Sequence, residues 1–145
     1  MGKKIGRKWR LSDTQPQHGK IVLITGANTG IGFEMAMEFA GKGAEVVLAC
    51  RNQTKATNAL ERIRARHPEA TVRTLGLDLA NLNALKQAAD EFIASTPHLD
   101  VLVNNAGTTR FIDFPDLEAV QNEDWDRILA VNLKGPFQMA RAARE

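Results

Sequence analysis

The chain has 145 residues, a length that suits one domain with a core of its own. Its 43% hydrophobic and 25% charged residues are ordinary for a globular protein, and a net charge of +2 gives no reason to expect a nucleic-acid partner. No apolar run approaches the roughly 20 residues that span a bilayer, so we expect no membrane segment. Cys50 is the only cysteine, which suits a reducing cytoplasm, and the three histidines lack metal-ligand spacing. We therefore expect a cytoplasmic protein without a metal site.

The amino terminus is the most basic part of the chain. The cations that crowd it are Lys3, Lys4, Arg7, Lys8 and Arg10. We interpret residues 1–18 as a basic arm that precedes a domain over residues 19–145. A solvated, disordered leader is the interpretation we favour for the arm. Contact with nucleic acid or anionic lipid is the alternative.

The domain opens with a strand and a helix. The β-branched apolar run at residues 20–25 predicts a buried strand. Ile31, Met35 and Phe39 then recur at helical spacing and predict a helix over residues 30–42, which glycines terminate.

The same alternation continues along the chain. Residues 44–50 predict a second strand, and Thr54 is the expected cap of a helix that ends before Pro68. Residues 71–77 predict a third strand.

Asn81 is the expected cap of the next helix, which should end near Pro97. Residues 99–103 predict the fourth strand, and a last helix begins near Asn122 and carries Trp125. Strand and helix alternate throughout, which predicts an α/β, Rossmann-like, doubly wound parallel sheet with strand order 3-2-1-4. We expect this fold to be truncated after the fourth strand and the following helix, so that the fourth strand forms an apolar edge.

A glycine-rich loop joins the first strand to the first helix. At that junction the free N–H groups and the positive end of a helix suit a pyrophosphate. The first glycine of the loop permits a tight turn, the second lets a phosphate approach the backbone, and the third allows close packing. We expect the loop to bind a nucleotide through Thr25, Gly26, Asn28, Thr29, Gly30, Ile31 and Gly32.

The end of the second strand indicates which nucleotide is preferred. A carboxylate there would bind the adenosine ribose and favour NAD. Here Cys50 and Arg51 follow instead, and an arginine can pair with a 2′-phosphate. We therefore predict NADP, with NAD less favoured. An ordinary surface arginine is the alternative.

Two further segments follow strands at the same edge of the sheet. Asp78 can accept a hydrogen bond from the amine of adenine, and we include the adjacent Leu79 in the same site; a loop or capping aspartate is the alternative. In the segment at residues 104–107, asparagine amides can bond to neighbouring strands and to the cofactor ribose, and we select Asn104 for the cofactor site. Taken alone, the segment could be a polar turn. Ala106 and Gly107 are small enough to leave room for the ribose and nicotinamide.

These motifs together resemble the short-chain dehydrogenase/reductase family. The resemblance rests on the glycine loop, on Asp78 and on residues 104–107, and it extends from about Gly19 to the end. It implies that Asn132 is the family's active-site asparagine, whose backbone holds a water in a proton relay. Independently, Pro136 has no N–H for the carbonyl of Asn132, so the helix should loosen there. The alternative is that Gly135 and Pro136 simply end or kink the helix.

The family also uses a serine and a Tyr-x-x-x-Lys pair, and the chain contains no tyrosine. Ser12 and Ser95 do not match, so Asn132 is the one catalytic residue that the resemblance transfers. Residues up to Gly107 resemble retinol-dehydrogenase-like members, whereas later residues resemble 3-oxoacyl carrier-protein reductases; a mosaic is one interpretation.

We expect the cofactor-binding portion of an NADP-preferring enzyme that exchanges hydride with a small carbonyl or alcohol substrate. The chain alone should be inactive. We further expect a homo-oligomer built on the free strand edge and the last helix. A non-catalytic nucleotide-binding or interaction module is the alternative.

Overall fold

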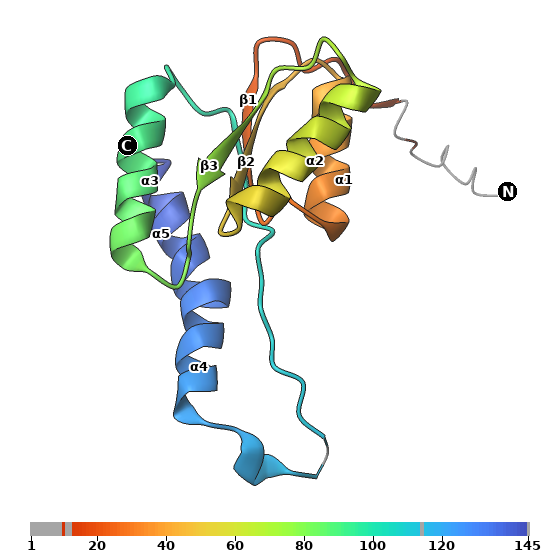
Figure 1. Cartoon of the computed structure of the whole chain (residues 1–145). Coiled ribbons are helices and arrows are strands. Elements are labelled where there is room, and N and C mark those ends of the chain that lie inside the picture. The colour runs from red at the N-terminus through yellow and green to blue at the C-terminus, as the bar shows by residue number, and fades with distance from the viewer. Residues whose placement is uncertain (1–9, 11–12, 114, 145) are drawn as a thin grey trace, which may run out of the picture.

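The computed structural model describes residues 10, 13–113 and 115–144. Most of the arm predicted at residues 1–18 therefore lies outside the described residues. Figure 1 shows one layer of strands with helices on both of its faces.

Every predicted strand and helix is present, although several boundaries shift by one or two residues. The elements run in the order β1 (Ile21–Thr25), α1 (Gly30–Gly41), β2 (Glu45–Cys50), α2 (Gln53–Arg66), β3 (Val72–Gly76), α3 (Leu82–Ser95), β4 (Val101–Val103), η2 (Leu117–Ala119), α4 (Asn122–Leu129), η3 (Ala130–Lys134) and α5 (Gly135–Ala142). The predicted alternation of strand and helix is thereby confirmed.

The four strands form one parallel sheet in the order β3-β2-β1-β4, as the sequence predicts. Helices α1 and α2 cover one face, and α3 and α5 cover the other (Figure 1). Strand β4 pairs with β1 alone and forms an edge of the sheet. The strand order reverses between β1 and β4, which is where doubly wound sheets bind ligands.

The two central strands are buried on both faces. Val22 and Ile24 of β1 pack into the core beneath α1 and α2, whereas Ile21 and Leu23 pack into the core beneath α3 and α5. This division follows from the alternation of side chains along a strand. It explains why both central strands are almost continuously apolar.

Helix α1 buries a different face from the one that the predicted row of Ile31, Met35 and Phe39 suggests. Its buried side chains include Phe33, Ala36 and Ala40. The small alanines allow the helix to lie close to the sheet. Ile31 is 76% exposed, so the row that predicted the helix does not form its main core contact.

The prediction that Thr54 caps the second helix is wrong. Asn52 is the cap, and its Oδ1 accepts a hydrogen bond of 2.9 Å from the N–H of Lys55. Asparagine at the end of β2 satisfies this donor first, so Thr54 falls within the first turn. The predicted cap at Asn81 is confirmed, because its side chain accepts from the N–H groups of Asn83 and Ala84.

The last helix is continuous in direction but changes its hydrogen-bonding pattern in the middle. Residues Ala130–Lys134 form the π-helical turn η3, and the N–H of Gly135 donates to the carbonyl of Ala130. Pro136 cannot donate to the carbonyl four residues earlier. The predicted loosening of the helix at Asn132 is therefore confirmed.

Candidate functional site

A polar cleft of about 420 Å³ lies at the carboxyl ends of the strands. It brings together four segments that are far apart in the sequence: the loop after β1, the start of α2, the residues after β3 and the residues after β4. The predicted site residues that line it are Thr25, Gly26, Asn28, Thr29, Arg51, Asp78, Leu79, Ala106 and Gly107. The sheet topology itself assembles this set, because parallel strands end at one edge.

The glycines of the loop meet different requirements. Gly26 has φ +67°, and a Cβ at this position would lie 2.9 Å from the Cα of Ala106. Gly30 also has a positive φ, +59°, but nothing lies within 4 Å of the position of its missing Cβ. The first glycine thus allows two backbone segments to meet, whereas the second permits a left-handed conformation beside open space.

The glycine loop is tied to the end of β4 by Thr25 and Asn105. The hydroxyl of Thr25 accepts hydrogen bonds from the N–H groups of Asn105 and Ala106 at 3.1 and 3.0 Å. The side-chain amide of Asn105 donates to the carbonyls of Thr25 and Gly26 at 3.0 and 3.3 Å. These bonds hold the two halves of the cleft in a defined relation.

The sequence analysis selected Asn104 and left out Asn105. Asn104 is exposed and lies outside the cleft lining. The side chain of Asn105 also occupies the space beside Gly32, where a Cβ would lie 2.3 Å from its amide nitrogen. The motif contains both asparagines, but the path of the backbone after β4 decides which of the two side chains reaches the glycine loop.

Two cations line the cleft at the end of β2. Arg51 is exposed, and no hydrogen bond or ion pair with another described residue engages its side chain. Lys55 lies four residues later, on the first turn of α2, and also lines the cleft. The sequence analysis missed Lys55, although its spacing from Arg51 on the helix start could have revealed it.

Cys50 lies directly beneath the loop and is 2% exposed. Burial raises the pKa of its thiol above the ordinary 9.0, whereas hydrogen bonds with the backbone of Ala27 and Asn28 act in the opposite direction. The neutral thiol therefore predominates in the folded protein at neutral pH. Cys50 supports the loop as a small apolar residue.

Asp78 and Leu79, which follow β3, line another part of the cleft. One carboxylate oxygen of Asp78, Oδ1, accepts a hydrogen bond of 3.0 Å from the N–H of Ala80, which fixes the turn after β3. Leu79 is 5% exposed and packs so closely on Gly135 that a Cβ there would lie 2.8 Å away. Gly135 thereby lets the last helix approach this wall.

Asn132 binds the backbone after β4 rather than lining the cleft. Its Oδ1 accepts from the N–H of Thr108 at 2.8 Å, and its Nδ2 donates to the carbonyl of Thr108 at 2.9 Å. The side chain thus pairs with that residue as a neighbouring strand would. Both the oxygen and the nitrogen of the side-chain amide are thus engaged with Thr108.

Three loop residues predicted to bind the nucleotide also lie outside the cleft lining, namely Gly30, Ile31 and Gly32. They form the first turn of α1, whose backbone N–H groups face away from the helix body. Within the described part of the chain, no group of acidic, histidine or cysteine side chains could hold a metal ion, and no helix combines the length and apolarity needed to cross a membrane.

A parallel sheet with a glycine-rich turn beside the reversal of strand order defines a Rossmann-type nucleotide-binding domain. The model of the family described as short chain dehydrogenase matches residues 20–145. The chain therefore belongs to the short-chain dehydrogenase family of oxidoreductases.

Individual relatives agree with this assignment. The chain is 49% identical over 90 residues to the WW domain-containing oxidoreductase of Homo sapiens, a match covering 62% of this chain and 22% of that protein. A metagenomic short-chain oxidoreductase in complex with NADP superposes with a TM-score of 0.81 at 32% identity, covering 90% of this chain and 57% of that one. A gluconate 5-dehydrogenase from Burkholderia cenocepacia J2315, in complex with NADP and tartrate, gives 0.75 at 35% identity, covering 88% and 48%. The chain thus spans about a fifth of the curated relative and about half of the solved ones.

Proposed function

We propose that the chain forms the NADP(H)-binding portion of a short-chain dehydrogenase that exchanges hydride with a small carbonyl or alcohol substrate. The observation that carries the proposal is the pair of free cations, Arg51 and Lys55, on the cleft wall at the end of β2. Both suit the 2′-phosphate that distinguishes NADP from NAD. No carboxylate stands at the first positions after β2 to repel that phosphate.

The cleft fits a dinucleotide in three respects. Its lining is mostly polar, the helix α1 starts beside it, and the space next to Gly30 is open. The loop would hold the pyrophosphate through backbone N–H groups, while Asp78 would accept from the adenine amine. Support for NADP also comes from the two solved relatives described above, which were crystallised with it.

The nicotinamide, when bound, supplies the hydride or accepts it. Asn132 would contribute its backbone carbonyl, at which a water could be held for proton transfer. The chain contains no tyrosine to act as the acid or base. We therefore propose that the 145-residue chain binds cofactor without turnover, which makes a non-catalytic nucleotide-binding module the second candidate.

We also propose that the protein acts in the cytoplasm as a homo-oligomer. Support comes from the apolar residues that the last helix leaves exposed, among them Trp125, Leu133 and Phe137. Together with Leu129 they follow one another at intervals of four residues, about one helical turn, and a second copy would bury them.

Calorimetric titration with NADPH and NADH tests the cofactor proposal. Replacing Arg51 by Ala should weaken NADPH binding by about 1–3 kcal/mol, the range for hydrogen bonds to a charged partner, and should spare NADH. Lys55→Ala should act in the same direction. Arg66→Ala, at the far end of α2, is the matched control and should change neither affinity. Equal losses for both cofactors in the Arg51 variant would remove the argument for NADP.

A further inference from the structure

An apolar groove of about 760 Å³ lies along the outer side of α1, and we refer to it as the α1 groove. Its lining is almost entirely apolar. Thr14 and Gln17 of the arm form one wall, and Ile31, Met35 and Phe39 form the other. The groove therefore lies between the described end of the arm and the helix that carries the glycine loop.

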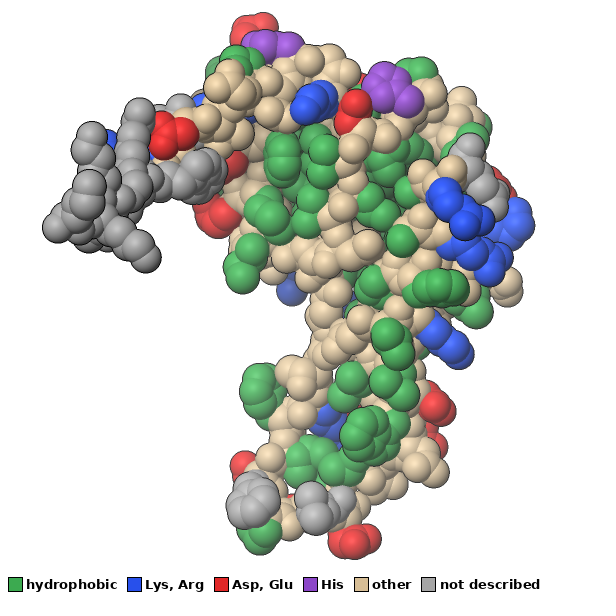
Figure 2. Space-filling view, turned by 180° about the vertical axis from the view of Figure 1, so that it is seen from behind, with side chains coloured by type: hydrophobic (Ala, Val, Ile, Leu, Met, Phe, Trp, Pro, Cys, Tyr) green, Lys and Arg blue, Asp and Glu red, His purple; other side chains and the backbone are tan. Residues whose placement is uncertain are grey.

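The core does not account for these apolar residues. Phe33, Ala36 and Ala40 already supply the face of α1 that packs on the sheet. Ile31 remains 76% exposed, and Met35 and Phe39 are only partly buried against the core. Figure 2 shows hydrophobic side chains exposed on the face of the molecule that it presents.

The rim of the α1 groove is acidic along the helix. Glu34 and Glu38 are exposed and line the groove, and their carboxylates make no hydrogen bond or ion pair with another described residue. Among the described residues that line the groove, Lys42 is the one cation, and it lies at the end of the helix. A ligand with an aromatic or aliphatic group between positive charges would complement this surface.

We propose that the amino-terminal segment of the same chain, residues 1–9, folds back along α1 and places Trp9 in the α1 groove. The segment lies outside the described residues, and it has the required chemistry. Trp9 and Ile5 are apolar, Lys8 and Arg7 are basic, and no acidic residue is present. Docking would bury the apolar row of α1 and pair the basic residues with Glu34 and Glu38.

The geometry of the arm puts Trp9 within reach. The N–H of Gln17 donates to the carbonyl of Lys42 at 2.8 Å, which fixes the arm at the end of α1. The N–H of Arg10 donates to Asp13 Oδ2 at 2.9 Å and closes a turn immediately before the groove wall. Trp9 directly precedes Arg10, so the Cα atoms of these two residues lie about 3.8 Å apart and the indole begins beside this fixed turn.

Tryptophan fluorescence of the full chain tests the docking. The chain has two tryptophans, so Trp125→Phe leaves Trp9 as the only emitter. In this background we expect emission at shorter wavelength than that of free tryptophan, together with protection from acrylamide quenching. Emission and quenching equal to those of free tryptophan would overturn the proposal.

Substitutions on α1 connect the signal to the groove. Ile31→Glu places a charge in the apolar wall and should shift Trp9 emission toward that of free tryptophan. Leu82→Glu, at an apolar residue on α3 that is 51% exposed, is the matched control and should leave the emission unchanged. An unchanged spectrum in the Ile31 variant would contradict docking at this groove.

A second variant addresses the acidic rim without changing the apolar wall. Glu34→Gln combined with Glu38→Gln should expose Trp9 partially. Added salt should have the same effect on the protein that keeps both glutamates, because salt screens surface charges. Docking within one chain predicts emission that is independent of protein concentration. Loss of the short-wavelength emission on dilution would assign the groove to the arm of a second copy and overturn docking within the chain.

Discussion

The central sheet and the last helical segment use their apolar residues in opposite ways. Every residue of β1 is buried, and β2 is buried after its first residue. Helix α4, by contrast, has no buried residue among those described, and it extends away from the sheet in Figure 1. Trp125, Leu129, Leu133 and Phe137 are between 46% and 64% exposed. Hydrophobic side chains are visible along the same projecting part of the molecule in Figure 2.

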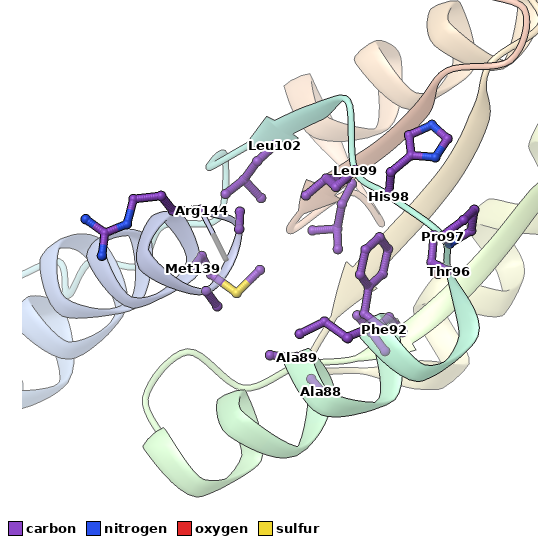
Figure 3. A pocket seen from close by; sticks show the side chains of 15 residues that line it. Ala88, Ala89, Phe92, Thr96, Pro97, His98, Leu99, Leu102, Met139 and Arg144 are labelled. Carbon is purple, nitrogen blue, oxygen red and sulfur yellow. The ribbon is translucent and has the colours of Figure 1, made fainter.

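Packing is also less complete where the last helix meets the sheet. An apolar pocket of about 540 Å³ is lined by residues of α3, β4 and α5, among them Phe92, Leu102 and Met139 (Figure 3). Few polar groups converge in this pocket, so it differs in chemistry from the cleft at the glycine loop. The cleft at the glycine loop is therefore built on the part of the domain that is packed on both faces, whereas the last helix leaves its large apolar residues exposed.

The largest test of this comparison replaces one leucine in each region. Leu48→Ala removes a fully buried side chain and should lower the free energy of unfolding by about 2–5 kcal/mol. Leu133→Ala, at a residue that is 64% exposed, should change it by no more than about 0.5 kcal/mol. Urea unfolding measures both values, and similar losses would break the comparison.

The same leucine tests self-association. Leu133→Glu should leave the fold intact. The variant should sediment as a monomer, with a lower sedimentation coefficient than the unmodified oligomer. A protein that is already monomeric at micromolar concentration would show that the exposed helix face does not serve as an interface.

The next test compares two glycines of the loop. Gly26→Ala and Gly30→Ala both force a side chain into positive φ, which costs about 1–2 kcal/mol. Gly26→Ala adds a collision with Ala106 and should cost about 1–3 kcal/mol more. For Gly30→Ala, by contrast, the loss in free energy of cofactor binding should exceed the loss in free energy of unfolding. Thermal unfolding and calorimetric titration separate the two effects, and equal stability losses would contradict the assigned roles.

The smallest effect concerns Cys50 in the buried region. Because burial raises the pKa of its thiol, the folded protein retains the proton at pH values where the unfolded chain has lost it. The free energy of unfolding should therefore fall as pH rises above about 9, by at most about 1.4 kcal/mol per pH unit from this group. Cys50→Ala should remove that part of the slope, so its stability relative to the unmodified protein should improve with pH. A constant difference between the two proteins across this range would argue against the raised pKa.

Local patterns in the sequence were sufficient for the order of elements and for much of the cleft. β-Branched runs marked the strands, the cap at Asn81 marked α3, and the glycine spacing marked the loop. Arg51, Asp78 and Ala106 could be selected because residues that follow parallel strands meet at one edge. Lys55 lies on the same edge but was missed, since it follows the strand by a helical turn.

Other features required the tertiary structure because they depend on direction rather than on residue type. The sequence determined that α1 is a helix, but packing against the sheet selected Phe33 and the alanines as its buried face and left Ile31 outside. The motif at residues 104–107 contained two asparagines, and the direction of the chain after β4 alone decided that Asn105 binds the glycine loop. Pro136 predicted a loosened helix, whereas the pairing of Asn132 with Thr108 became visible only when segments 24 residues apart came together. Short-range propensity determines which elements form, but the contacts between elements decide which side chains meet.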